Sequence, residues 1–212
     1  MTDEVLNPRE FRARTIAGNR PAFELWKATW NLIESAISAP RMHPDPFSVA
    51  CDLLFIQAYK ASCSVYFLAL RGHEEDAAAI LRRLLEVGAQ IGYLDQSPNP
   101  AERQARAEVY LQHNPESGGY WWGRTFKDLF CRLNLAATYD QDYRFLAQIA
   151  HAAARRVLPE VKDSVVQIRN TEFFTPLLVF ACRYLLWAAR IWNSCFTLVD
   201  NDELGVTRNL AH

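Results

Sequence analysis

The stretch FSVACDLLFIQAYKASCSVYFLALR, residues 47–71, decides the fold class of this chain. Its apolar residues occupy most sides of a helix, a distribution typical of a helix that is surrounded by others. Lys60 is the main exception, and Gly72 follows as a natural C-terminal cap. We therefore expect this segment to be the central helix of a helical bundle.

Helical patterns continue on both sides of this segment. Apolar residues recur every three or four positions in residues 21–38, and three prolines within residues 39–46 then form a stiff connector. Thr175-Pro176 has the pattern of an N-cap followed by a first-turn proline, so the last helix is expected to begin there. The expected helices cover residues 21–38, 47–71, 74–94, 101–113, 120–137, 138–158 and 175–199.

No segment of useful length shows the two-residue alternation of a half-buried strand, and no internal repeat is visible. The sequence therefore predicts an all-α fold, a single-domain irregular bundle of six or seven helices. Residues 1–20 are expected to be a flexible N-terminal segment, residues 21–199 the bundle, and residues 200–212 a loose C-terminal tail. Gly88 and Gly92, four residues apart, predict a close helix crossing.

The composition excludes one class of function. The chain has 212 residues, half of them hydrophobic, with 23 basic against 24 acidic residues. A protein that binds nucleic acid over a broad surface usually carries a clear basic excess. Bulk polyanion binding is therefore not expected, although a local basic patch is compatible with this balance.

The cysteines and the apolar segments bear on the compartment. The five cysteines show no CxxC spacing and lie in apolar helical context, so we interpret them as small buried hydrophobic residues in a reducing cytoplasm. The N-terminus has no basic segment followed by an apolar run, so no secretory signal is expected. Arg183 and Arg190 interrupt the most apolar helix, so no membrane span is expected. We expect a cytoplasmic protein.

Familiar catalytic and metal-binding motifs are absent from the sequence. It contains no GxGxxG or GxxxxGK[ST] phosphate loop, no GxSxG elbow and no HExxH. His43 with Asp45, and His73 with the acidic residues 74–76, each lack a second fixed cluster of ligands. We therefore expect neither a metal site nor a cofactor.

Arg144 and His151 are the candidate catalytic residues. They stand seven positions apart in one predicted helix, so both side chains share a face, with Gln148 between them and Arg155 beyond. A histidine can move a proton of a ribose 2′-hydroxyl, and an arginine can stabilise charge on the phosphate, without a metal. The alternative, which a short motif of this kind favours, is a solvated polar stripe or a polar seam between packed helices.

A second polar row, formed by Arg82, Glu86 and Gln90, runs along the predicted 74–94 helix at a spacing of four. One interpretation is a small-ligand pocket within the bundle, lined by Arg82, Glu86, Lys60 and tyrosines. The alternative is an ion pair that ties helices together, with Lys60 at the bundle edge. Trp121 and Trp122 are expected to pack in the core rather than stack on nucleobases.

The span from residue 55 to 158 resembles an uncharacterised bacterial helical family, described only as a domain of unknown function. The resemblance rests on Leu70-Arg-Gly-His-Glu-Glu-Asp-Ala77, on Leu81-Arg-Arg-Leu-Leu-Glu86, and on Tyr139, Tyr143 and His151. Family members carry a serine four residues before this histidine, where this chain has Ala147. The resemblance implies an all-helical bundle and no particular activity.

The Arg144–His151 spacing is also similar to the motif of HEPN domains, helical and often dimeric proteins that include metal-independent ribonucleases of toxin and phage-defence systems. The resemblance implies that Arg144 and His151 are the catalytic pair at a dimer cleft. Phe145 departs from the polar residue that usually follows the arginine in active members.

Three hypotheses for the function follow. The first is a cytoplasmic helical protein that acts by binding or protein interaction, as a homodimer. The second is a HEPN-like endoribonuclease that acts on RNA through Arg144 and His151. The third is a small-ligand-binding bundle, for which Lys60, Arg82, Glu86, Gln148 and Arg155 are the candidate binding residues.

Overall fold

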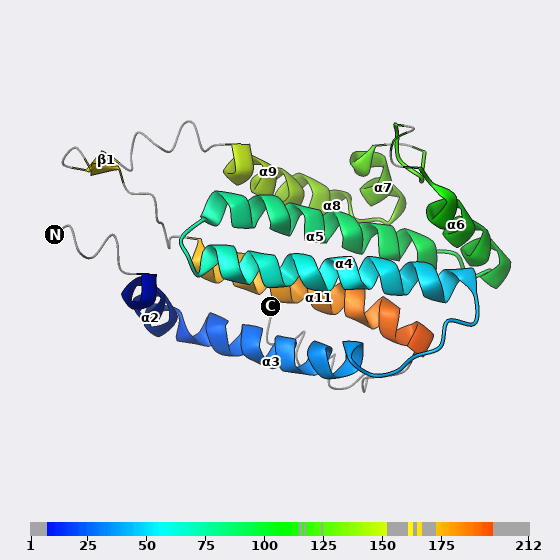
Figure 1. The fold of residues 1–212 in the computed structure, drawn as a ribbon. Helices are drawn as coiled ribbons and strands as arrows, with labels where there is room; N and C mark the ends of the chain where they lie inside the picture. The colour runs from blue at the N-terminus through cyan, green and yellow to red at the C-terminus, as the bar shows by residue number, and fades with distance from the viewer. Residues whose placement is uncertain are drawn as a thin grey trace.

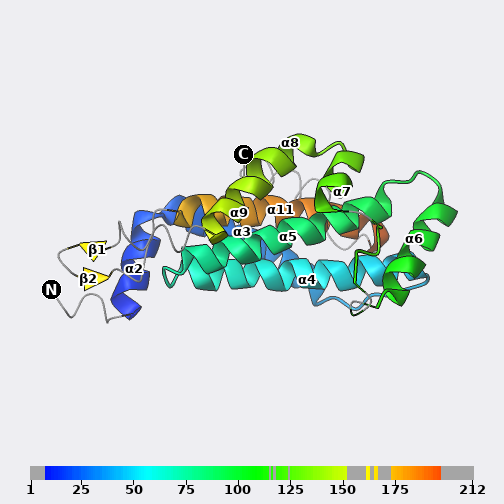
Figure 2. The same ribbon diagram turned by 90° about the horizontal axis from the view of Figure 1, so that it is seen from above.

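The computed structural model describes residues 8–114, 116, 118–123, 125–151, 161–162, 165–166 and 173–196. Three long helices make the core: α4 (Pro46–Ala69), α5 (Glu74–Asp95) and α11 (Phe174–Phe196) pack against one another. Helix α3 (Arg20–Ile37) lies along α11 on one side of this core, and α9 (Arg144–His151) lies against α5 on the other (Figures 1 and 2). The expected all-α bundle is confirmed.

The most deeply buried helix is α5, whereas the sequence pointed to the 47–71 segment. Every residue from 84 to 92 of α5 is buried, because α4, α11 and α9 pack around that stretch. Helix α4 instead leaves one face in solvent, where Leu53 and Phe67 are 45% and 52% exposed. The apolar composition of α4 misled the prediction because it does not distinguish exposed from buried apolar residues.

The first twenty residues also depart from expectation. Residues 8–18 form a helix, α2 (Pro8–Gly18), where a flexible segment was expected. It contacts the start of α3, and Thr175 at the start of α11 donates a hydrogen bond of 2.7 Å to Asn19 between the two helices. Thr175 lies within α11 rather than capping it. Residues 1–7, 152–160 and 197–212, which include the expected C-terminal tail, lie outside the described residues.

Between α5 and α9 the structure contains less helix than predicted. Helix α6 (Pro100–Gln112) matches expectation, but the 120–137 region contains only α7 (Phe126–Arg132) and the single turn α8 (Ala136–Thr138). Asp128 and Thr125 form the capping box of α7, which explains its late start. The side chain of Thr138 makes no capping hydrogen bond, and the chain passes through a π-helical turn, η2 (Tyr139–Tyr143), into α9.

Two very short strands, β1 (Val161–Lys162) and β2 (Val165–Val166), pair antiparallel in the connection between α9 and α11. They form a two-stranded hairpin and leave the all-α class unchanged. Asp45 caps α4 through a capping box with Ser48, and Gly72 has a φ of 78° between α4 and α5, as its role as a helix cap requires.

The side chain of Trp187, from α11, packs against the two glycines of α5. A Cβ atom on Gly88 would lie 2.8 Å from the indole ring of Trp187, and one on Gly92 would lie 3.2 Å from it. The close crossing predicted for this pair therefore occurs between α5 and α11, with an aromatic side chain in the gap.

Helix α11 is long and apolar enough to cross a membrane by length and composition alone. In this bundle it packs against α3, α4 and α5, and 56% of its most apolar 18-residue stretch is buried. Its apolar residues are thereby used in the core, so its composition is weak evidence for a membrane span.

Candidate functional site

The polar row of α5 converges on the buried carboxylate of Glu86, which is 7% exposed. The hydroxyl of Tyr143, from η2, donates a hydrogen bond of 3.0 Å to one of its oxygens. Arg82 Nε lies 3.6 Å from Glu86 Oε1, and Arg83 Nη1 lies 3.4 Å from Oε2. The expected Arg82–Glu86 pair therefore exists, within a larger cluster that also contains Arg83 and Tyr143.

The charges of this cluster do not cancel. Two guanidinium groups share one carboxylate, so Arg82, Arg83 and Glu86 together carry one net positive charge. Arg82 lies over the ring of Tyr143 at 5.7 Å, which holds its guanidinium in place. Burial and the negative charge of Glu86 raise the pKa of Tyr143, so the phenol stays protonated and donates a hydrogen bond to the carboxylate.

Gln90 links this cluster to the neighbouring segment. Its side-chain nitrogen donates to the backbone oxygen of Glu86 at 3.3 Å, and its side-chain oxygen accepts from the indole N–H of Trp121 at 2.8 Å. Because both ends of the amide are bonded, its orientation is fixed. The third member of the sequence-predicted row thus positions Trp121.

Next to Gln90 lies a hollow of about 330 Å³ between α4, α5, α6 and the Tyr120–Trp122 segment, which we call the aromatic groove. Arg83, Gln90, Gln57 and His113 bring polar groups to it, and aromatic side chains make much of the remaining wall. Its size and composition fall in the range of small-molecule sites, which are concave, mostly apolar and served by a few polar groups. The lining residues are Leu54, Gln57, Arg83, Gln90, Tyr110, His113, Tyr120, Trp121, Trp122 and Phe126.

The two adjacent tryptophans have different roles. Trp122 is 6% exposed and stacks on Tyr120 with ring centroids 4.5 Å apart, so it packs in the core as expected. Trp121 meets Trp122 edge to face and stays partly exposed. Both line the aromatic groove, and on their other side they border a second hollow of about 320 Å³ with Arg106. The indole of Trp121 therefore separates two depressions.

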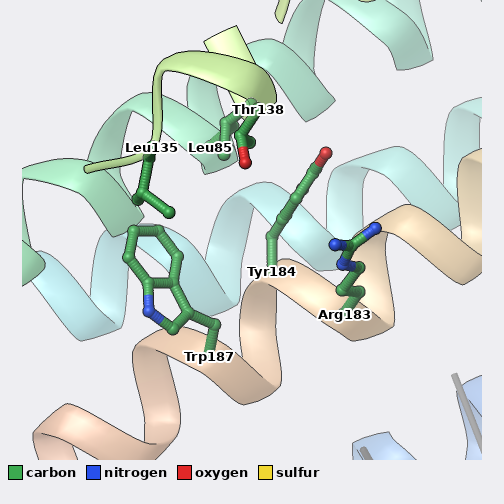
Figure 3. A pocket seen from close by; sticks show the side chains of 6 residues that line it. All are labelled: Leu85, Leu135, Thr138, Arg183, Tyr184 and Trp187. Carbon is green, nitrogen blue, oxygen red and sulfur yellow. The ribbon is translucent and has the colours of Figure 1, made fainter. Parts of the chain in front are cut away.

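A smaller pocket of about 140 Å³ lies between α5, the α7–α8 segment and α11. Figure 3 shows Arg183, Tyr184 and Trp187 rising from α11, with Leu135 and Thr138 facing them across the pocket. The hydroxyl of Tyr184 donates a hydrogen bond of 2.6 Å to Asp142. This volume is below that of a typical ligand site, so the aromatic groove is the stronger candidate.

Arg144 and Gln148, two residues of the candidate catalytic face, both lie exposed on α9. Arg144 makes an i,i+4 ion pair of 3.7 Å with Asp140. His151 is the last residue of α9, but its side chain, like the whole of Arg155, lies outside the described residues. The structure therefore places the backbones of Arg144 and His151 on one helix without defining the geometry of the pair.

Lys60 does not join the Glu86 cluster. It is exposed on α4 in the same stripe as Gln57 and Phe67, because seven residues return a helix to nearly the same face. This is the bundle-edge position weighed in the sequence analysis.

A second buried carboxylate, Asp52 of α4, was missed by the sequence analysis. It accepts hydrogen bonds from Arg41 Nε at 2.7 Å and from the indole N–H of Trp192 at 2.8 Å, and it lies 2.9 Å from His43 Nε2. Burial alone would raise its pKa, but the bonds from Arg41, Trp192 and His43 outweigh burial and lower it. We call these four residues the Asp52 cluster.

The Asp52 cluster holds the proline-containing connector against the core. Arg41 also donates to the backbone oxygens of Ile37 and Ala39 at 2.6 and 3.2 Å, so its donors bind both the connector and Asp52. The sequence contained no local signal for the cluster, because Trp192 is 140 residues from Asp52. Within the part of the chain that the structure describes, no three His, Cys, Asp or Glu side chains are arranged to hold a metal ion.

Comparison with known proteins gives no match to a family model, to a curated protein or to a solved structure.

Proposed function

We propose that this chain is a helical binding protein whose aromatic groove takes a small planar ligand with a negatively charged group. The observation that carries the proposal is the excess guanidinium charge at the edge of the groove. Arg83 lines the groove, its side chain is 52% exposed, and it shares the carboxylate of Glu86 with Arg82. An anionic group on a ligand would complete the pairing of Arg83.

The rest of the groove supports a planar ligand. Tyr110 and Trp121 meet edge to face with centroids 5.3 Å apart, which leaves aromatic surface directed at the hollow. Gln57 and Gln90 supply amide groups at the wall, and Gln90 is already fixed by two hydrogen bonds. Fixed polar groups on an aromatic wall favour a ligand with defined hydrogen-bonding positions.

Matched probes can test this proposal: indole-3-acetate, a planar aromatic carboxylate, and its neutral analogue indole-3-acetamide. Calorimetric titration of the full chain should show tighter binding of the carboxylate. Arg83→Gln should weaken carboxylate binding by about tenfold or more, since a hydrogen bond to a charged group contributes about 1.5–3 kcal/mol. It should leave binding of the amide nearly unchanged.

Two control variants locate the binding. Arg71→Gln removes an exposed arginine that does not line the groove, and should leave both titrations as in the wild type. Trp121→Ala removes aromatic wall and should weaken both probes together. Equal binding of the carboxylate by the wild type and Arg83→Gln, or no binding of either probe, would refute the proposal.

We also propose that the protein is a homodimer, through the outer face of α3 and α4 rather than through the Tyr120–Trp122 segment. Phe67 is 52% exposed there and borders an apolar groove of about 250 Å³ with Trp26 and Trp30. Apolar surface of this kind favours self-association. Light scattering should give a dimer mass for the wild type and a monomer mass for Phe67→Lys.

A metal-independent ribonuclease remains the second candidate, supported by the position of Arg144. Its side chain is 63% exposed, so substrate has access to it. If the hypothesis holds, RNA cleavage should persist in EDTA, spare DNA of the same sequence, and fall by about 10²–10⁴-fold in His151→Ala. RNA left intact by the wild type would remove this candidate and leave the groove proposal unaffected.

A further inference from the structure

The sequence favoured buried, inert cysteines, but the structure separates them into different environments. Cys51 and Cys182 are buried, Cys63 and Cys195 are partly exposed, and Cys131 is exposed. Cys51 lies in the second turn of α4, and Cys195 lies at the end of α11. These two cysteines are far apart in sequence, and the packing of the two helices brings them together.

Several contacts define the register of α4 against α11 at this end of the bundle. The ring of Phe55 stacks on Trp192 with centroids 4.4 Å apart, and Asp52 accepts the indole N–H of Trp192. The two helices run antiparallel, so moving back one turn from Phe55 on α4 corresponds to moving forward one turn from Trp192 on α11 (Figure 1). That step leads to Cys51 on one helix and Cys195 on the other.

The side chains of Cys51 and Cys195 interact across the helix interface. The S–H of Cys195 points at the backbone oxygen of Ile191, 4.0 Å away. The interaction between the two cysteines raises the pKa of Cys51, which is also buried, and lowers the pKa of Cys195. The register set by Phe55 and Trp192 therefore brings the two thiols to the same level of the α4–α11 interface.

We propose that Cys51 and Cys195 form a reversible redox pair that oxidises to a disulfide joining α4 to α11. Cys195 is the attacking residue, since it is the partly exposed one of the two, and Cys51 is the resolving residue. The oxidant class is a hydroperoxide, which is small enough to reach a partly exposed thiol. Neither thiol belongs to the aromatic groove, so this inference is independent of the binding proposal.

The reaction balances in two steps. The thiolate of Cys195 attacks one oxygen of hydrogen peroxide, the O–O bond breaks, and hydroxide leaves and takes up the proton lost by the thiol. The sulfur of Cys51 then attacks the sulfenic sulfur of Cys195, the S–O bond breaks, and the proton of Cys51 completes a second water. Two thiols are oxidised, one peroxide is reduced, and the disulfide forms inside the helix interface.

The disulfide would close a long loop of chain beside the Asp52 cluster. A cross-link between segments so far apart in sequence restricts the unfolded chain strongly. Oxidation should therefore raise the melting temperature of the full chain, and reduction with dithiothreitol should return it to the starting value.

The test treats the reduced full-length protein with hydrogen peroxide, blocks remaining thiols with N-ethylmaleimide, and maps peptides by mass spectrometry. The expected result is a peptide pair linked through Cys51 and Cys195, formed before any other disulfide. In Cys51→Ser the sulfenic acid of Cys195 has no resolving thiol, so dimedone should label it strongly. Cys131→Ser, which removes an exposed cysteine elsewhere, should give the same linked pair as the wild type.

Two outcomes would overturn the proposal. One is a Cys51 that remains a thiol while Cys195 passes directly to sulfinic acid. The other is a set of disulfides that disappears in Cys131→Ser, because the oxidation would then occur between exposed cysteines of different molecules. If Cys51→Ser fails to fold, the linked-peptide map of the wild type and Cys131→Ser still decides the question.

Discussion

Asp52 and Glu86 are both buried carboxylates of the bundle, and their surroundings differ in a way that separates structure from binding. Asp52 is met by Arg41, His43 and Trp192 at 2.7–2.9 Å, and its partners come from the connector and from α11. Glu86 accepts one hydrogen bond of 3.0 Å from Tyr143, and its arginine nitrogens lie farther away than Arg41 lies from Asp52, at 3.4 and 3.6 Å. Short bonds from separate segments indicate a carboxylate that holds the fold together.

The two sites also differ in how far their arginines are available. The side chain of Arg41 is 12% exposed and its donors are bonded to Asp52 and the connector. The side chain of Arg83 is 52% exposed and borders a hollow. Removing the first carboxylate should therefore cost stability, whereas removing the second should mainly change what the protein binds.

The largest expected effect is at Asp52. Asp52→Ala leaves the charge of Arg41 and the N–H of Trp192 buried without their acceptor, and should lower the free energy of unfolding by about 3–5 kcal/mol. Urea unfolding followed by circular dichroism measures this. Asp140→Ala, which removes only the exposed ion pair to Arg144, should cost about 1 kcal/mol or less. Similar losses in both variants would contradict the assignment of Asp52 as structural.

The Asp52 cluster should also give a defined pH dependence. The pKa of Asp52 is lowered in the folded state, so its contribution is complete above the unfolded value of about 3.9 and is lost as pH falls through the folded value. The wild type should exceed Asp52→Asn in stability by about 1.5–3 kcal/mol at neutral pH. Below about pH 4 this difference should shrink. A difference that stays constant down to pH 2 would contradict the lowered pKa.

A smaller effect on stability is expected at the contact between α5 and α11. Gly88→Ala places a methyl group 2.8 Å from the ring of Trp187, so the indole or the helix must shift, at a cost of about 1–3 kcal/mol. Gly18→Ala is the matched control, since a Cβ there meets nothing within 4 Å. Calorimetric melting of both variants compares them. An unchanged melting temperature for Gly88→Ala would show that Trp187 adjusts without cost.

The smallest effect on stability is expected at Glu86, where binding should change instead. Glu86→Gln keeps an acceptor for Tyr143 and should cost about 1 kcal/mol, the net value of an ordinary hydrogen bond. Because it removes the anion that competes for Arg83, it should strengthen indole-3-acetate binding about three- to tenfold. Titration calorimetry on both proteins measures the change. Weaker binding in Glu86→Gln would mean that the carboxylate positions Arg83 rather than competes for it.

The sequence predicted only the part of the candidate site that lies within a single helix. Arg82, Glu86 and Gln90 fall on one face of a helix because of the helical repeat, and a single helix is enough to predict that. The partner Tyr143 and the groove itself could not be predicted, since they depend on how η2 and the Tyr120–Trp122 segment pack on α5. The placement of Lys60 relative to Arg82 and Glu86 could not be predicted for the same reason, because it depends on how α4 packs against α5.

By itself the sequence determined that the fold is all-α, where α4, α5 and α6 begin and end to within a few residues, and that α5 approaches another helix closely at Gly88 and Gly92. These properties depend on periodicity, capping and side-chain size within one segment. Only the tertiary structure decided that α5 is the buried centre, that Asp52 binds Trp192, and that Phe55 stacks on Trp192. Such contacts join residues on different helices, and helical periodicity defines the face of a helix without identifying what packs against it.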